Sequence, residues 1–261
     1  MPLSRSLLGG LVTTAAASLA LAGCGAASSS TGAAGAATAS GSATAAASGT
    51  ASSGSVAVSG AGADVYFPAA VGETWVYQVQ EGAMKGTTTN KVTAVTSTAG
   101  GTQVTMANSE DFTGAVQTST FDYVIHSDGS ISIPMNFGTG ADTFKVTSGG
   151  LAWPSPAQLA SGRPVDDTIT MSGSAAGQTI SVTAHAVLKG EGTQSVTVPA
   201  GTYQATVIDE VETETVLGTP TTSDIKTWLV NGVGPVKEVM ADGADGTDVG
   251  LNEVLTSFTK G

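Results

Sequence analysis

The residues with the clearest capacity for chemistry are carboxylates that gather in two short clusters. In the first cluster, Glu210, Glu212 and Glu214 occupy alternate positions, so in a strand their side chains leave the same face. They would lie about 6.5 to 7 Å apart, where like charges repel unless water, lysine or a cation lies between them. The pattern favours a solvated strand face that resists aggregation at a sheet edge, with a chemical role as the alternative.

The second cluster contains Asp242, Asp245 and Asp248 in a stretch bent by Gly243 and Gly246. Carboxylate oxygens on such a loop suit a hard cation such as calcium. The stretch lacks the alternating carboxylates and the distant glutamate of an EF-hand loop. A polar hairpin turn is therefore favoured, because Asp-Gly pairs commonly mark turns. We expect no cofactor, and calcium is the alternative.

Groupings that resemble catalytic sites are sparse, and their context is unfavourable. Residues 126–128 read His-Ser-Asp, but alternation in a strand sends neighbouring side chains to opposite faces, so they cannot form a catalytic relay. Ser223 and Lys226 match a Ser-x-x-Lys pattern, yet they lie in a strand pattern and not on a helix. His185 lies on the polar side of its strand and is expected to be solvated. We therefore predict that the protein is not an enzyme.

The elements that must position these residues are β-strands, because apolar residues recur with a period of two. Trp75, Tyr77 and Val79 alternate with polar or smaller residues, and residues 180–188 repeat the pattern. Asp128-Gly129 is a strong hairpin signal, and the best helical candidate is a single turn at residues 156–160. Further candidate strands are 87–97, 102–108, 115–127, 130–134, 168–174, 194–198, 203–216, 222–230, 236–240 and 247–258.

These patterns predict an all-β domain of about ten to twelve antiparallel strands. The expected architecture is a sandwich or a curved, partly closed barrel that follows a disordered N-terminal region. Aromatic residues make up only 5% of the chain. Large rings are therefore valuable for filling the core. Core packing is favoured for Trp75, Tyr77, Tyr203 and Trp228, and a ligand-binding pocket lined by them is the alternative.

The domain that contains these strands is predicted to span residues 64–261. It holds all 21 acidic and 8 of the 9 basic side chains, a formal charge of −13. Such an acidic surface argues against nucleic acid and against electrostatic docking to anionic lipid. Residues 25–63 are Ala, Gly, Ser and Thr apart from Val56 and Val58. This composition cannot bury enough apolar area to order itself, so residues 24–63 are expected to form a flexible tether.

Residues 1–23 have the features of a lipoprotein signal peptide. Arg5 precedes an apolar stretch, and Leu21-Ala22-Gly23-Cys24 then fits the bacterial lipobox, whose cysteine is lipidated. Acyl chains on Cys24 would anchor the protein to the cell membrane or outer membrane, with the domain on the extracytoplasmic side. The alternative is an ordinary secretory signal that is cut nearby, for example after Ala26 or Ala27.

Three motifs resemble those of a large group of uncharacterised bacterial envelope domains, which are often lipoproteins. Residues 66–77, YFPAAVGETWVY, resemble the group's YYPL-x-VG-x-x-W-x-Y opening. Residues 198–203, VPAGTY, resemble its VPAGTF turn, and residues 232–237, GVGPVK, resemble its GVG-x-VK hairpin. The resemblance covers essentially the whole mature domain. It implies a β-rich envelope domain, and it implies no particular activity.

The sequence therefore predicts a membrane-anchored lipoprotein with a non-catalytic binding or carrier domain. Its partners would be the membrane, through the lipid anchor, and an envelope protein or an apolar ligand such as a lipid. No nucleic-acid partner is expected. The alternative is a structural or assembly accessory protein of the cell envelope.

Overall fold

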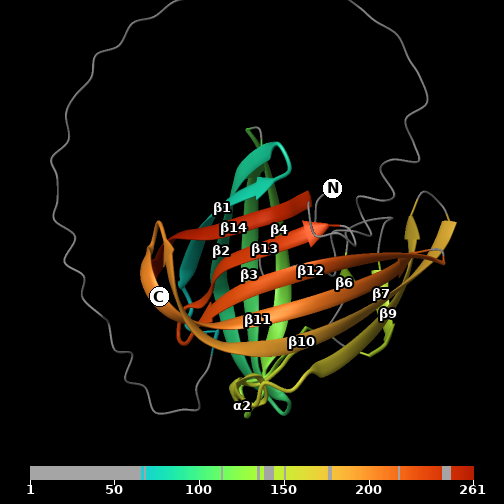
Figure 1. The fold of residues 1–261 in the computed structure, drawn as a ribbon, viewed down its shortest axis with the longest axis horizontal. Coiled ribbons are helices and arrows are strands. Elements are labelled where there is room, and N and C mark those ends of the chain that lie inside the picture. Colours follow the sequence, from blue (N-terminus) through green and yellow to red (C-terminus); the bar gives the residue numbers. More distant parts are fainter. Residues whose placement is uncertain are drawn as a thin grey trace, which may run out of the picture.

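The computed structural model describes residues 66–67, 69–112, 114–133, 136–137, 144–149, 151–175, 178–216, 218–242 and 248–261. Fourteen of the described segments are strands, and all of them belong to one antiparallel sheet (Figure 1). The strands run in the order β6-β7-β9-β10-β11-β12-β13-β14-β1-β2-β3-β4-β5-β8 across the sheet. Because β6 and β8 are its two edges, the sheet is not closed by hydrogen bonds.

The strands differ widely in length, from two to 21 residues. Their bounds are β1 (Thr74–Glu81), β2 (Met84–Thr98), β3 (Gly101–Phe112), β4 (Ala115–Ile125), β5 (Ile131–Ile133), β6 (Asn136–Phe137), β7 (Phe144–Ser148), β8 (Leu151–Trp153), β9 (Val165–Ala175), β10 (Gln178–Val198), β11 (Gly201–Val216), β12 (Thr219–Val230), β13 (Gly234–Asp242) and β14 (Asp248–Thr259).

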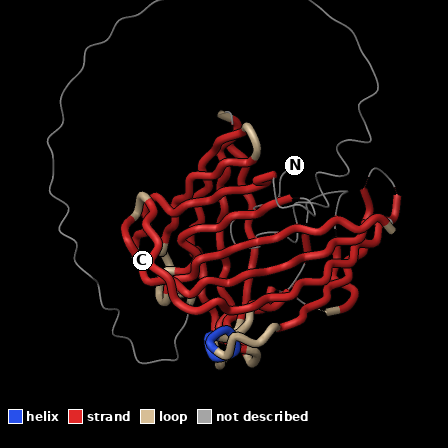
Figure 2. Tube along the Cα trace, viewed as in Figure 1, coloured by secondary structure: helices blue, strands red, loops and turns tan. Residues whose placement is uncertain are grey.

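The long sheet bends over so that its two halves face each other. Strands β2 to β4 cross behind strands β10 to β13 (Figures 1 and 2). The described part of the chain contains one short helix. This arrangement confirms the predicted all-β, antiparallel and partly closed architecture. The strands that the sequence did not predict are β6, β7 and β8, which contain two, five and three residues.

Two local predictions are confirmed with adjustments. The predicted strands 180–188 and 194–198 are one strand, β10, whose pairing with β11 is irregular between Gly190 and Thr193. The hairpin at Asp128-Gly129 joins β4 to β5, and Gly129 adopts a φ of 80°. The turn is longer than two residues, because the His126 N–H donates to the Ser130 carbonyl to close it.

The helix lies at the predicted position, residues Pro156–Ala160, and is labelled α2. Ser155 caps it: its hydroxyl accepts from the Gln158 N–H, and the Gln158 side chain accepts from the Ser155 N–H. Leu159 is the buried residue of this helix. The described part of the chain contains no helix that is long and apolar enough to cross a membrane.

The inner face contains a closely packed apolar core that extends over both halves of the sheet. The Phe67 ring centroid lies 6.2 Å from that of Tyr123 and 5.8 Å from that of Trp153. The contact with Trp153 is edge-on. Residues from both halves of the sheet are completely buried here, including Val92, Val104, Leu229, Val236 and Leu255. The chain therefore fills much of the inner face with its own apolar side chains.

Candidate functional site

The inner face also carries carboxyl groups. Alternation along β11 directs Glu210, Glu212 and Glu214 inward, and Glu212 and Glu214 are only 2% and 3% exposed. Glu210 is partly exposed. The predicted solvated strand face is therefore wrong. A period of two shows which side chains share a face, but the opposite half of the sheet determines whether that face meets water.

Further carboxyl groups reach the same region from other strands. Glu238 on β13 is the direct cross-strand partner of Glu253 on β14. Glu238 also interacts electrostatically with Glu210, and Glu253 with Glu110 on β3. Glu210 interacts in turn with Asp167 on β9. We call the set Asp167, Glu210, Glu212, Glu214, Glu238, Glu253 and Glu110 the carboxyl row.

Neutral polar side chains accompany the carboxyl row. The Thr227 hydroxyl donates to Glu238 Oε2 at 3.3 Å, and Ser223 is the cross-strand partner of Glu212. In the crossing half of the sheet, Asn108 Nδ2 donates to Asn90 Oδ1 at 2.8 Å. These groups make the region polar over several strands.

Several oxygens in the carboxyl row are buried and have no hydrogen-bond partner in the described part of the chain. Both carboxylate oxygens of Glu253 are in this state, as are Oε1 of Glu212 and Oε1 of Glu238. A buried carboxylate without a partner is costly, because nothing replaces the water it has lost. These atoms can therefore accept protons, cations or hydrogen-bond donors that the described part of the chain does not supply.

The environment of the row strongly favours protonated carboxyl groups. Burial, followed by repulsion from Glu210, Glu214 and Glu238, raises the pKa of Glu212 to about 9. Burial and Glu210 raise the pKa of Glu238 to about 8, although its bond from Thr227 acts in the opposite direction. The row therefore retains protons at neutral pH.

The remaining members follow the same rule. Burial and the nearby Asp167 raise the pKa of Glu210 to about 7. Burial, Glu238 and Glu110 raise the pKa of Glu253 well above its usual value. Among the described residues, no three His, Cys, Asp or Glu side chains are grouped so that they could hold a metal ion. The carboxyl groups are spread out and do not converge on one point.

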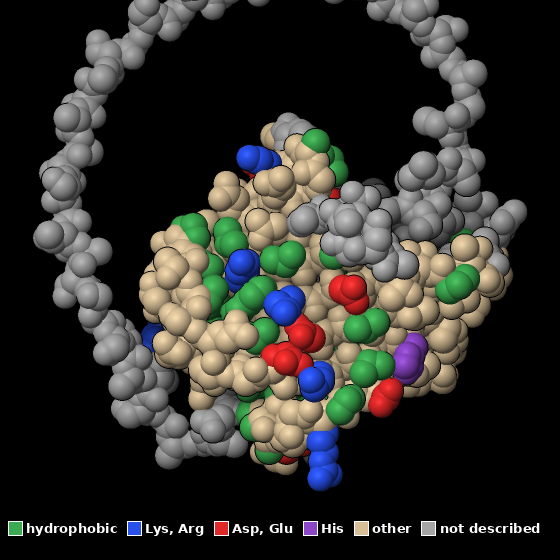
Figure 3. Space-filling model, viewed as in Figure 1, with side chains coloured by type: hydrophobic (Ala, Val, Ile, Leu, Met, Phe, Trp, Pro, Cys, Tyr) green, Lys and Arg blue, Asp and Glu red, His purple; other side chains and the backbone are tan. Residues whose placement is uncertain are grey.

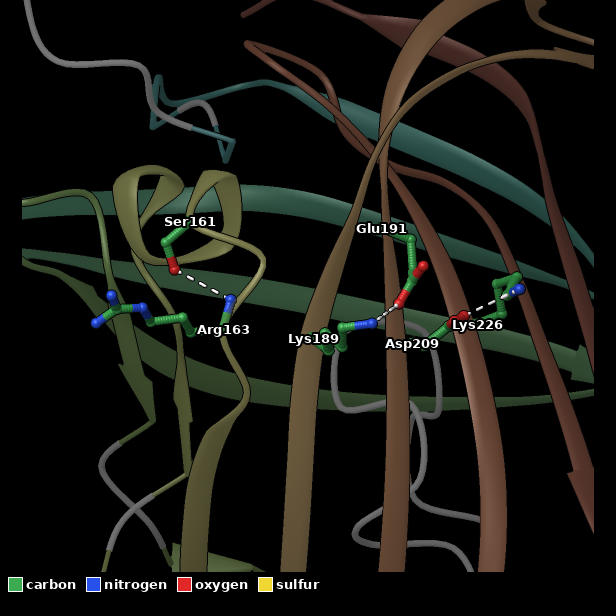
Figure 4. A network of polar contacts seen from close by, with 6 residues as sticks. All are labelled: Ser161, Arg163, Lys189, Glu191, Asp209 and Lys226. Atoms are coloured by element: carbon green, nitrogen blue, oxygen red, sulfur yellow. Dashed lines mark hydrogen bonds and ion pairs between the residues drawn. The ribbon is translucent and has the colours of Figure 1, made fainter.

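The basic side chains lie on the outside of the fold. Every described Lys or Arg side chain is exposed or partly exposed. Lys189 Nζ lies 2.7 Å from Glu191 Oε1, and Lys226 Nζ lies 3.0 Å from Asp209 Oδ1 (Figure 4). Figure 4 also shows the Arg163 backbone N–H, which donates to the Ser161 hydroxyl. Basic and acidic side chains also lie side by side on the face in Figure 3. The outer carboxylates Glu191 and Asp209 thus have cationic neighbours.

The four aromatic candidates lie in or beside the apolar core. Trp75 and Tyr77 are buried. The Trp75 indole N–H donates to the Val233 carbonyl, and the Tyr77 hydroxyl donates to the Pro235 carbonyl at 3.0 Å. The first motif therefore packs on the GVGPVK turn.

Tyr203 and Trp228 are partly buried against the core. The Tyr203 hydroxyl donates to the Ala200 carbonyl at 3.3 Å, and Lys237 Nζ lies 4.6 Å from the Trp228 ring centroid. All four aromatic residues thus make contacts within the fold, and a ligand-binding role for them stays a prediction.

The structure does not test the other predicted sites. Cys24 and Asp245 lie outside the described residues. Asp242 and Asp248 are cross-strand partners at the ends of β13 and β14, but their side chains are also outside the described part. Lipidation at Cys24 and calcium binding at the Asp cluster stay predictions.

The groupings that resembled catalytic sites are separated or redirected. His126 Nδ1 lies 2.7 Å from the Gly100 carbonyl, and its Nε2 lies 2.8 Å from the Ser132 hydroxyl. Asp128 instead accepts from Ser130, so residues 126–128 form no relay.

Strand alternation likewise separates the Ser-x-x-Lys pair. Ser223 is buried on the inner face, whereas Lys226 is exposed on the outer face. His185 is exposed, as predicted, and lies 3.4 Å from Asp166.

Sequence reasoning missed Asp167, Glu238, Glu253 and Glu110, although a signal for two of them was present. Glu238 lies between the inward-facing Val236 and Met240, and Glu253 lies between Leu251 and Leu255. A glutamate at an apolar position of an alternating strand points towards the core. Glu238 and Glu253 were therefore recognisable as buried, but their proximity to each other was not.

Comparison with known proteins gives a family and a fold. A family model described as DUF3108-like matches residues 71–245. No curated protein matches the chain. A Bacteroides fragilis protein described as exported, with a YmcC-like fold, has a TM-score of 0.56 at 14% identity, over 76% of this chain and 100% of its own. A Parabacteroides distasonis protein described as a lipoprotein has a TM-score of 0.58 at 14% identity, over 76% and 99%.

Proposed function

The chain belongs to the DUF3108-like family, and we propose that its β-domain is a non-catalytic binding or carrier module, tethered to the outer side of a bacterial membrane. The lipobox at Leu21–Cys24 and the Ala/Gly/Ser/Thr tether support the anchoring. The descriptions of the two structural neighbours, one as exported and one as a lipoprotein, agree with this location.

The observation that carries the binding proposal is the set of unpartnered carboxyl oxygens on Glu212, Glu238 and Glu253. A folded chain normally satisfies its buried polar atoms, and exceptions often mark the place of a ligand, ion or water. The apolar core around these groups is filled by the chain's own side chains. The carboxyl row is therefore the part of the inner face that would take up a ligand.

Mass spectrometry of small molecules extracted from the full-length protein, purified from its native membrane, tests this function. We expect one compound at close to one per protein, and we expect it to be lost from a Glu238→Gln, Glu253→Gln double variant. Asp224→Asn is the matched control, because Asp224 is an exposed carboxylate on the outer face of β12. If no compound accompanies the wild-type protein, the binding role fails and a structural or assembly role in the envelope takes its place.

The membrane anchor is tested separately by fractionating cells that express Cys24→Ser. We expect this variant to move from the membrane to the soluble fraction, because it can no longer be acylated. The mature N-terminus of the wild-type protein provides the control: the lipobox predicts that it begins at Cys24. An N-terminus after Ala26 or Ala27, or a variant retained at the membrane, would contradict the lipobox assignment.

A further inference from the structure

We propose that the ligand of the carboxyl row is a linear polyamine, a small molecule in which short alkyl chains join two or more ammonium groups. This inference rests on the proposed binding function and specifies the ligand's chemical class.

The first argument is complementarity of charge and hydrogen bonding. Glu212, Glu238 and Glu253 present unpartnered acceptor oxygens, and no described Lys or Arg side chain is buried near them. An ammonium group carries up to three donors and no acceptor, and its charge favours the ionised form of a carboxyl group within about 4 to 6 Å. A polyamine would therefore supply both missing components, the donors and the positive charge.

The second argument is the extent of the row. Apart from Glu110 on β3, its members run from Asp167 on β9 to Glu253 on β14, across five strand intervals. At about 4.8 Å per interval, the backbones that carry it extend over about 24 Å of the sheet. A single metal ion needs several ligands around one point, and the described residues offer no such group. A spread of carboxyl groups matches an elongated ligand with separated charges.

The third argument is the pattern of side chains between the carboxyl groups. Ile225 is the cross-strand partner of both Glu210 and Met240, and Ala186 is the partner of both Glu212 and Asp167. Ala186 thus lies between two carboxyl groups, and Ile225 and Met240 extend from a third as an apolar segment. Apolar surface beside carboxyl groups suits a polyamine, in which alkyl segments separate the ammonium groups.

The row also offers a graded approach from solvent. Asp167 and Glu210 are partly exposed, whereas Glu238 and Glu253 are 3% and 2% exposed. An amine can therefore meet the exposed carboxyl groups before it reaches the buried ones. Because the row holds protons without a ligand, binding of ammonium groups would release protons and become tighter as the pH rises.

Isothermal titration of the full-length protein with spermidine in 0.15 M NaCl tests the inference. At pH 8 we expect saturable binding of one spermidine per protein, at least tenfold tighter than at pH 6, with release of protons measured by comparing two buffers. Glu238→Gln and Glu253→Gln should each weaken binding at least tenfold, and Asp224→Asn should change it less than twofold. 1,7-Heptanediol, a linear chain with no charge, should not bind.

Three results would overturn the inference: no spermidine binding at pH 8, equal loss in Asp224→Asn and the Gln variants, or equal binding of the diol. If a Gln variant does not fold, as judged by circular dichroism, the wild-type protein provides the test. The absence of proton release when it binds spermidine would reject the inference. A co-purified compound without amines would reject the polyamine and leave the binding function standing. If nothing co-purifies and spermidine does not bind, both fail.

Discussion

Tyr77 lies where the apolar core and the carboxyl row meet. It is 2% exposed, and its hydroxyl donates to the Pro235 carbonyl at 3.0 Å. Burial, Glu253 and Glu238 raise the pKa of its phenol well above the usual value, so it remains a neutral donor. The Tyr77 hydroxyl thus satisfies a buried carbonyl where the apolar core meets the carboxyl row.

Removing this hydroxyl in Tyr77→Phe should lower the free energy of unfolding by about 1–3 kcal/mol, because the buried Pro235 carbonyl loses its partner. Urea denaturation monitored by circular dichroism measures the change. Tyr203→Phe is the matched control, since the Tyr203 hydroxyl makes a longer bond of 3.3 Å at a partly exposed position. An equal or larger loss in the control would contradict the assigned role of Tyr77.

Strand β10 and helix α2 show how one element depends on another. Gly190 lies at the irregular point of β10, directly against the backbone of Leu159 in α2. A Cβ at this position would collide with the Leu159 carbonyl oxygen. The glycine is thus required by the close approach of the helix.

Gly190→Ala should therefore destabilise the domain by about 1–3 kcal/mol, because the backbone of the helix or the strand must move. Thermal denaturation of the full-length variant would show the loss. Gly100→Ala provides the control, since a Cβ there would meet nothing closer than 3.9 Å. If both variants melt at the wild-type temperature, the packing of α2 on β10 does not contribute as described.

The domain as a whole concentrates its proton-binding groups inside and its ion pairs outside. The inner carboxyl groups Glu210, Glu212 and Glu238 have pKa values of about 7, 9 and 8, against an ordinary value of 4.5. The unfolded chain releases these protons above pH 4.5, whereas the folded domain retains them until about pH 7 to 9. Unfolding therefore releases protons throughout this interval.

We expect the free energy of unfolding to be greatest near pH 4.5 to 5 and to fall as the pH rises towards 9. Each retained proton contributes at most about 1.4 kcal/mol per pH unit. Urea denaturation at pH 5, 7 and 9 measures the trend, and Glu212→Gln, Glu238→Gln should make it shallower. A free energy of unfolding that is constant or increases with pH would contradict this account.

The sequence by itself determined the local structure, because strand formation and turns depend on neighbouring residues. The alternation around Trp75 and Tyr77, the Asp128-Gly129 turn and the helical turn at residues 156–160 all predicted elements that the structure contains. It also showed that Glu210, Glu212 and Glu214 share one face.

Only the tertiary structure decided what that face meets. Burial depends on the crossing of strands that are far apart in the chain, so the pattern along β11 could not distinguish a solvated face from an enclosed one. The same crossing brings Glu110 on β3 near Glu253 on β14, about 140 residues away in sequence. A row of carboxyl groups that looked like an outer surface is, for this reason, the candidate binding site inside the fold.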